Sequence, residues 1–167
     1  MAMVFLGLGS NLGDRLANIV EARKELAVLP ETILMENAPI YETKALGGPA
    51  DQEDYLNSVS LVDTKLEPHD LLKHLHTIER RLGRRREGET GRWGPRLIDL
   101  DILFWDDSVV EEADLVIPHP RLAERAFVLV PLADIYPDML HPVIELTIRE
   151  LLERIGPEHE GVRRLSL

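Results

Sequence analysis

The sequence of 167 residues contains no cysteine, which excludes a disulfide scaffold and metal sites built from thiolates. It also has no apolar run of about 18 residues, the length that a membrane-spanning helix needs. Its N-terminus has no basic segment ahead of an apolar stretch, so no secretory signal is indicated. We therefore expect a cytoplasmic protein that does not bind membranes.

Aromatic residues are scarce, at 5% of the chain, and the formal net charge at pH 7 is −11. Both values argue against nucleic acid as a partner, because RNA-binding sheets are usually basic and present aromatic rings. The proportions of hydrophobic residues (44%) and charged residues (29%) are those of an ordinary globular protein. We expect a single domain over residues 1–167, in which residues 156–167 form a tail that can fray.

Arginine is concentrated in one stretch of this acidic chain. Between Arg80 and Arg96 there are seven arginines and two glutamates, so the local charge is +5 and the rest of the chain carries −16. Such a cluster is either a solvated face or a clamp for a polyphosphate.

The residues after this cluster predict a strand with two acids on one face. Side chains in a strand alternate between faces, so the carboxylates of Asp99 and Asp101 share one face and lie about 6 to 7 Å apart. At an effective dielectric of about 20 their repulsion is roughly 3 kcal/mol, so a cation must offset it. The apolar positions predicted to line the opposite face are Ile98, Leu100, Ile102 and Phe104.

An exposed pair of aspartates can simply be solvated, but the context favours a metal site. Aspartate is disfavoured in strands, and functional sites are where local propensity is commonly violated. Carboxylates without thiolates favour magnesium over zinc, and magnesium takes its remaining ligands from phosphates and water. Asp99 and Asp101 therefore predict a magnesium site that serves a nucleotide.

The remaining apolar patterns predict an antiparallel sheet with helices packed on one of its faces. This arrangement is a ferredoxin-like α/β sandwich of the α+β class. Pro39 weakens the end of the second strand because proline cannot donate a backbone hydrogen bond. The other strands are expected over residues 3–8, 33–41 and 55–62, and helices are expected to start after Asp14, at Pro68 and at Thr147.

Two further groups of residues allow both a structural and a functional interpretation. Tyr55 and Asn57 share a strand face, and they are either the polar end of that strand or a pair that binds a flat heterocycle. His119 has a proline on each side, which holds its backbone extended, and it is either a turn residue or a ligand contact. Arg125 and Phe127 follow within reach of it.

Taken together, four segments resemble the 6-hydroxymethyl-7,8-dihydropterin pyrophosphokinases, folate-pathway enzymes that move a pyrophosphoryl group from ATP to a pterin hydroxymethyl group. The resemblance covers nearly the whole chain, and its central motif, Arg92 to Asp101, is highly specific. The segments are residues 7–13, 54–57, 92–101 and 117–127.

The resemblance implies roles for the matching residues. Arg84 and Arg96 are expected to act on the transferring phosphates as catalytic residues, and Asp99 and Asp101 to bind two magnesium ions. The residues expected on the ATP side are Glu79, Arg86, Arg92, Ile102, His119 and Arg125. The residues expected around the pterin are Thr43, Leu46, Tyr55, Asn57, Trp93, Asp99 and Phe127. The implied partners are ATP and 6-hydroxymethyl-7,8-dihydropterin, and we expect a monomer or a weak homodimer.

Two other functions stay open on the sequence alone. One is a catalytically silent protein that binds a nucleotide or a pterin, and the other is a ferredoxin-like module that binds RNA. The presence of both acids and of the flanking arginines disfavours the first. The two aspartates on the open strand face disfavour the second.

Overall fold

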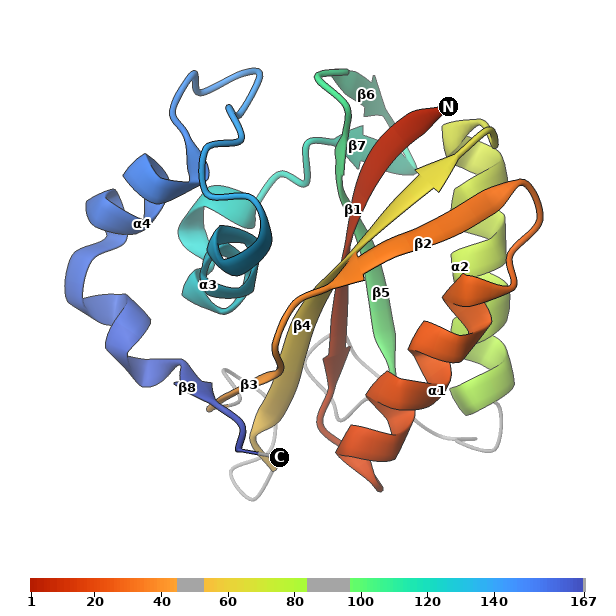
Figure 1. The fold of residues 1–167 in the computed structure, drawn as a ribbon, viewed down its shortest axis with the longest axis horizontal. Coiled ribbons are helices and arrows are strands. Elements are labelled where there is room, and N and C mark those ends of the chain that lie inside the picture. The colour runs from red at the N-terminus through yellow and green to blue at the C-terminus, as the bar shows by residue number, and fades with distance from the viewer. Residues whose placement is uncertain (45–52, 84–96, 167) are drawn as a thin grey trace.

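Strand β1 (Ala2–Ser10) is an interior strand of an antiparallel sheet (Figure 1). The computed structural model describes residues 1–44, 53–83 and 97–166. Strand β1 pairs with β4 (Tyr55–Thr64) on one side and with β5 (Asp99–Trp105) on the other. Its residues are largely buried on both faces, as expected for a central strand with a nearly continuous apolar run.

Two short strands pair in succession along the far side of β4. These are β2 (Thr32–Asn37) and β3 (Tyr41–Thr43), where the sequence predicted one strand over residues 33–41. The interruption contains Pro39, which cannot donate to a ladder. Strand β8 (Arg163–Arg164) pairs with β3, so these two residues of the tail lie in the sheet.

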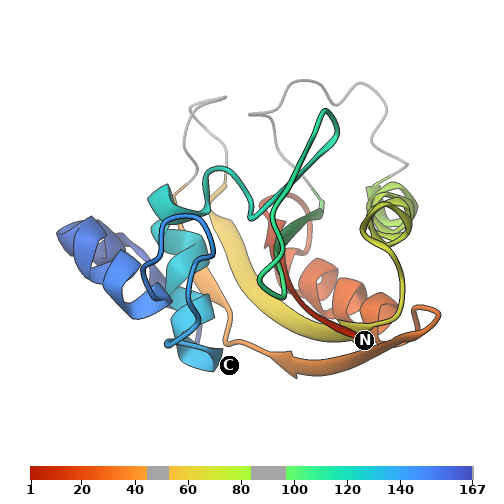
Figure 2. The same ribbon diagram turned by 90° about the horizontal axis from the view of Figure 1, so that it is seen from above.

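Helices α1 (Arg15–Ala27) and α2 (Pro68–Gly83) cover one face of the sheet (Figures 1 and 2). The side chain of Asp14 accepts a hydrogen bond from the backbone N–H of Ala17 (3.1 Å) and caps α1 as expected. The core on this face includes Leu6, Leu8, Ile19, Leu26, Leu75, Ile78, Leu100 and Ile102.

Helices α3 (Ala126–Ile135) and α4 (Ile148–Ile155) pack on the opposite face, so the expectation of helices on a single face was wrong. Helix α4 begins with a capping box between Thr147 and Glu150. This second core includes Phe5, Val59, Leu61, Leu103, Phe104, Leu129, Leu132 and Leu151.

A bulge in β5 changes which face Phe104 occupies. Ile102 pairs with Leu6 and Phe104 pairs with Phe5, so Leu103 is an extra residue. Leu103 and Phe104 consequently both belong to the second core, and the prediction that Phe104 shares a face with Ile102 was wrong.

The connections complete the chain around this sheet. A hairpin of β6 (Val110–Glu112) and β7 (Leu115–Ile117) follows β5, and a short 3-10 helix, η1 (Leu122–Glu124), leads into α3. A second 3-10 helix, η2 (Gly156–Gly161), joins α4 to β8. Within the described residues, no helix is long and apolar enough to cross a membrane.

Candidate active site

The two acids of β5 and the asparagine of β4 lie on one face of the sheet, separated by a glycine of β1. Asp99 pairs with Gly9, and Gly9 pairs with Asn57. Asp101 pairs with Gly7 in the same way. Paired residues of neighbouring strands project from the same face. Because the residues of β1 between the acids and Asn57 are glycines, no side chain of β1 separates the acids from Asn57.

The amide of Asn57 is held in one orientation. Its Nδ2 donates to Oγ1 of Thr43 on β3 (3.0 Å), and both side chains are buried. A Cβ at Gly9 would lie only 3.0 Å from Oδ1 of Asn57, so that oxygen lies directly against the glycine. Tyr55 pairs with Thr43 and is half-buried, so the predicted pterin residues Thr43, Tyr55 and Asn57 lie together.

Three carboxyl groups gather at the edge of the sheet formed by β5. Asp99 and Asp101 are half-buried, and Glu79 of α2 accepts a hydrogen bond from the backbone N–H of Leu100 (2.8 Å). Burial, together with the nearby charges of Asp99 and Asp101, raises the pKa of Glu79 to about 7 against the lowering effect of the Leu100 N–H. The resemblance implied that Glu79 lies on the ATP side, but no periodic pattern in the sequence predicts its hydrogen bond to β5.

These oxygen donors fit a hard divalent cation better than a soft one. Among the residues that the structure describes, no group of three or more acidic or histidine side chains converges as a complete metal cage. That donor set suits an ion which takes its other ligands from phosphate and water, as magnesium does.

His119 lies next to the acids as a neutral hydrogen-bond donor. Its backbone N–H donates to the carbonyl of Leu103 (3.0 Å), and its Nδ1 accepts from the backbone N–H of Arg121 (3.2 Å). The ring proton must therefore be on Nε2. Burial and the charge of Arg125 lower the pKa of His119 to about 4, although Asp99 opposes this effect, so the ring is uncharged at neutral pH.

Arg125 brings a positive charge to the same place. Burial and the charge of Arg121 lower its pKa, and the guanidinium is close enough to Asp101 and Asp99 for their charges to act in the opposite direction. Its Cζ lies 5.5 Å from the centroid of the Phe127 ring at the start of α3. Arg125 thus lies between the predicted ATP side and the predicted pterin side.

Ile102 is placed differently from the other predicted ATP-side residues. Its side chain is buried in the core with α1 and α2 and does not reach the face that carries the acids. Leu100 directs its backbone N–H away from β1 toward Glu79, and Ile102, two residues later, directs its backbone groups the same way. A nucleotide contact at Ile102 is therefore open only to its backbone. The predicted residues Leu46, Arg84, Arg86, Arg92, Trp93 and Arg96 lie outside the described residues.

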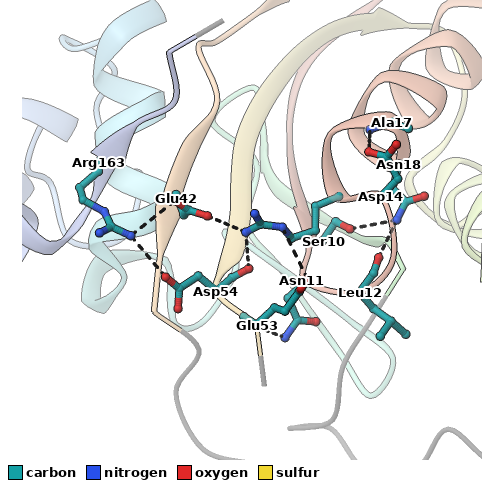
Figure 3. A network of polar contacts seen from close by, with 11 residues as sticks. Ser10, Asn11, Leu12, Asp14, Ala17, Asn18, Glu42, Glu53, Asp54 and Arg163 are labelled. Carbon is teal, nitrogen blue, oxygen red and sulfur yellow. Dashed lines mark hydrogen bonds and ion pairs between the residues drawn. The ribbon is translucent and has the colours of Figure 1, made fainter. Parts of the chain in front are cut away.

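An ion-pair network borders the Thr43 side of this site (Figure 3). Nη1 of Arg15 lies 2.7 Å from Oε2 of Glu42 and donates to the backbone carbonyl of Asp54 (2.8 Å). Arg163 of β8 approaches the carboxylates of Glu42 (3.5 Å) and Asp54 (3.3 Å). Sequence reasoning missed this network, because isolated surface charges carry no periodic signal. The glycines of β1 did carry a signal in the sequence, because a glycine within a strand marks a position where another group approaches the backbone closely.

The fold and this arrangement of acids, histidine and arginine are typical of a transferase that acts on the phosphates of a magnesium-bound nucleotide. The sequence pattern of the 7,8-dihydro-6-hydroxymethylpterin-pyrophosphokinase (HPPK) family matches residues 5–137. The chain belongs to this family, as the resemblance predicted.

Relatives with this name are similar over most of the chain. The 2-amino-4-hydroxy-6-hydroxymethyldihydropteridine pyrophosphokinase of Methylorubrum extorquens is 42% identical over 166 residues, which cover 99% of this chain and 100% of the relative. That of Aquifex aeolicus is 39% identical over 150 residues, or 90% of each chain. The folic acid synthesis protein fol1 of Pneumocystis carinii is 41% identical over 157 residues, and this chain spans only 20% of its length.

Solved structures show the same fold. The HPPK-DHPS protein of Plasmodium falciparum, crystallised with SDX-DHP, has a TM-score of 0.71 and 18% identity, and the match covers 100% of this chain and 48% of that one. An HPPK-DHPS complex with substrates has a TM-score of 0.75 and 16% identity, covering 99% and 47%. This similarity supports the predicted sheet with helices packed on it.

Proposed function

We propose that this chain catalyses its family's reaction on the sheet face that carries Asp99, Asp101 and Asn57. ATP donates its β- and γ-phosphoryl groups as a unit to the hydroxymethyl group of 6-hydroxymethyl-7,8-dihydropterin. The observation that supports this proposal is the row Asp99, Gly9 and Asn57, because a carboxylate suited to a metal and an amide suited to a heterocycle flank one glycine.

The proposed reaction is a single displacement at the β-phosphorus of ATP. The pterin hydroxyl oxygen forms a bond to the β-phosphorus, and the bond from that phosphorus to the oxygen it shares with the α-phosphorus breaks. AMP leaves with that oxygen, and the hydroxyl proton passes to the solvent. The reaction needs no nucleophilic side chain, so the protein contributes mainly by positioning and by charge.

We assign the acid pair to magnesium, with two ions as the expected number. Bound magnesium would offset the charge of the triphosphate and polarise its oxygens. Asp99 and Asp101 would hold the ions, and Glu79 would add negative charge beside them while its bond to Leu100 fixes the edge of β5. The arrangement favours a cation most strongly once Glu79 has lost its proton.

His119 and Arg125 are assigned to the phosphates. His119 offers its Nε2–H to a phosphate oxygen without adding a charge that titrates near pH 7. Arg125 offers a full positive charge beside the acids. Arg84, Arg86, Arg92 and Arg96 remain predicted phosphate contacts on sequence grounds.

The pterin is assigned to the part of the site formed by Thr43, Tyr55, Asn57 and Phe127, with Leu46 and Trp93 as predicted additions. Asn57 presents a fixed amide to the heterocycle edge, and the aromatic rings offer their faces. Among the described residues nothing favours a silent binding protein, and the sheet face that an RNA-binding module would use carries two aspartates.

Product analysis tests this proposal. The protein is incubated with ATP, magnesium and 6-hydroxymethyl-7,8-dihydropterin, and phosphorus NMR should show AMP and a pterin pyrophosphate. Formation of ADP and a pterin monophosphate would place the attack on the γ-phosphorus. Full activity in EDTA would remove magnesium from the mechanism.

A further inference from the structure

Thr43, which orients the Asn57 amide, lies on a strand too short to hold itself in place. Strand β3 has three residues and pairs with the start of β4. Three-residue strands contribute few ladder hydrogen bonds, and an edge strand has only one neighbour unless another segment covers it. The position of Thr43 therefore depends on what covers the outer edge of β3.

The C-terminal segment covers that edge. Tyr41 pairs with Arg164 and Glu42 pairs with Arg163, and the backbone N–H of Leu165 donates to the carbonyl of Ile40 (2.8 Å). Because successive side chains of a strand point to opposite faces, the two arginines of β8 serve opposite faces of the sheet.

On one face, Arg163 joins the ion-pair network that surrounds β3 (Figure 3). The Glu42 carboxylate lies between Arg15 at 2.7 Å and Arg163 at 3.5 Å, and its side chain is 26% exposed. Arg163 also approaches Asp54, which directly precedes Tyr55. One guanidinium thus connects the strand that carries Thr43 to the beginning of the strand that carries Tyr55 and Asn57.

On the other face, β3 is attached to the helix that carries Phe127. The hydroxyl of Tyr41 donates to the carboxylate of Asp134 in α3. Arg164 is close enough for its charge to act on Tyr41. Strand β8 therefore contacts β3 at the place where β3 also contacts β4 and α3, the elements that carry other predicted pterin residues.

We propose that Arg163 is a positioning residue for pterin binding. With Arg15, it fixes Glu42 and Asp54, so Thr43 and Tyr55 keep the separation at which Thr43 orients the Asn57 amide. Arg163 does not touch the substrate, and it acts on pterin affinity without acting on the phosphates. This inference rests on the proposed function and assigns a further residue to its pterin side.

The test measures the two substrates separately. Arg163→Ala should raise the KM for the pterin about fivefold, equivalent to about 1 kcal/mol, with kcat and the KM for ATP within about twofold of wild type. Isothermal calorimetry with the dihydropterin should show the same loss of affinity. Raising the salt concentration should weaken pterin binding by the wild type more than by the variant, because salt screens the exposed ion pairs of Arg163.

Arg149→Ala is a matched control. The Arg149 side chain is 59% exposed, as is that of Arg163, and it forms an ion pair with Asp138 at 3.1 Å on a different part of the molecule. This variant should leave both KM values unchanged. Arg163→Lys should restore part of the pterin affinity, because Nη2 alone approaches both carboxylates and an ammonium can supply one such nitrogen, although on a shorter side chain.

Glu42→Gln offers an independent perturbation of the same network. It should raise the pterin KM, and adding Arg163→Ala to it should have less than the sum of the two effects, because both changes break one network. An unchanged pterin KM in Arg163→Ala, or an equal rise in both KM values, would overturn the inference. Absence of pyrophosphoryl transfer by the wild type would instead overturn the proposed function.

Discussion

Replacing Gly9 with alanine tests whether the bare backbone beside Asn57 controls pterin binding. The new Cβ would lie 3.0 Å from Oδ1 of Asn57 and 3.8 Å from Cδ1 of Tyr55. The first distance is shorter than a usual carbon–oxygen contact, so the Asn57 amide has to move by a few tenths of an ångström. It cannot do so freely, because its Nδ2 donates to Thr43 in a buried hydrogen bond of 3.0 Å.

The expected effect is on binding more than on folding. A displaced Asn57 amide should make a poorer hydrogen bond to the pterin, and weakening a buried hydrogen bond costs about 1 to 2 kcal/mol, which corresponds to a loss of pterin affinity of about 5- to 30-fold. Gly9 does not have a left-handed backbone conformation, so alanine is sterically allowed there and lowers the entropy of the unfolded chain. The strain on the Asn57–Thr43 hydrogen bond lowers stability and the lower entropy of the unfolded chain raises it. The melting temperature should therefore change by only a few degrees.

Calorimetry with the dihydropterin and, separately, with a non-hydrolysable ATP analogue and magnesium measures the two affinities. Affinity for the nucleotide should stay within about twofold, because the nearest atoms to the new Cβ belong to Asn57, Tyr55 and Leu56. Gly7→Ala is the control on the same strand, since its Cβ would make an ordinary contact of 3.4 Å with the side chain of Leu103. Wild-type pterin affinity in Gly9→Ala would refute the reasoning.

Four further substitutions test the other parts of the site. Asp99→Asn and Asp101→Asn should each reduce magnesium-dependent transfer by about a hundredfold or more in a kinetic assay, non-additively when combined, and the metal-free melting temperature should stay unchanged or rise because a repulsion is relieved. Asn57→Ala should weaken pterin binding in calorimetry and leave binding of an ATP analogue nearly intact; the reverse would mean that the two pockets are assigned the wrong way round. Glu79→Gln should gain stability relative to wild type as the pH rises from about 4.5 to about 7, because over that range the carboxyl loses its proton in the unfolded wild-type chain but keeps it in the folded one, where the pKa is raised. Denaturant unfolding of the metal-free proteins at pH 5 and pH 8 measures this difference in the free energy of unfolding. The same change with pH in both proteins would contradict the prediction.

The face of β5 that carries the acids could be predicted because alternation in a strand is a local property. Asp99 and Asp101 point to one face, as the period of two requires. The same rule failed at Phe104, because an extra residue at Leu103 shifts the register and a bulge leaves no mark in the apolar pattern.

The side of the sheet on which each helix packs could not be predicted from its own sequence. The apolar stripe of α4 shows that the helix must be buried, but not against which face. The connection through Arg163 was equally hidden, because its partners Glu42 and Asp54 are distant in sequence and all three are ordinary charged residues. Contacts of this kind follow from the complete topology.

The row that joins Asp99, Gly9, Asn57 and Tyr41 draws each residue from a different strand. Strand β1 pairs with β4 and β5, and neither is its neighbour in sequence, so this row forms only when distant parts of the chain have come together. A partly folded chain consequently has no such row with which to bind the pterin. Ligand that binds only the complete fold stabilises the whole domain by mass action, so bound pterin should slow the hydrogen exchange of amides throughout the sheet, including those far from the ligand.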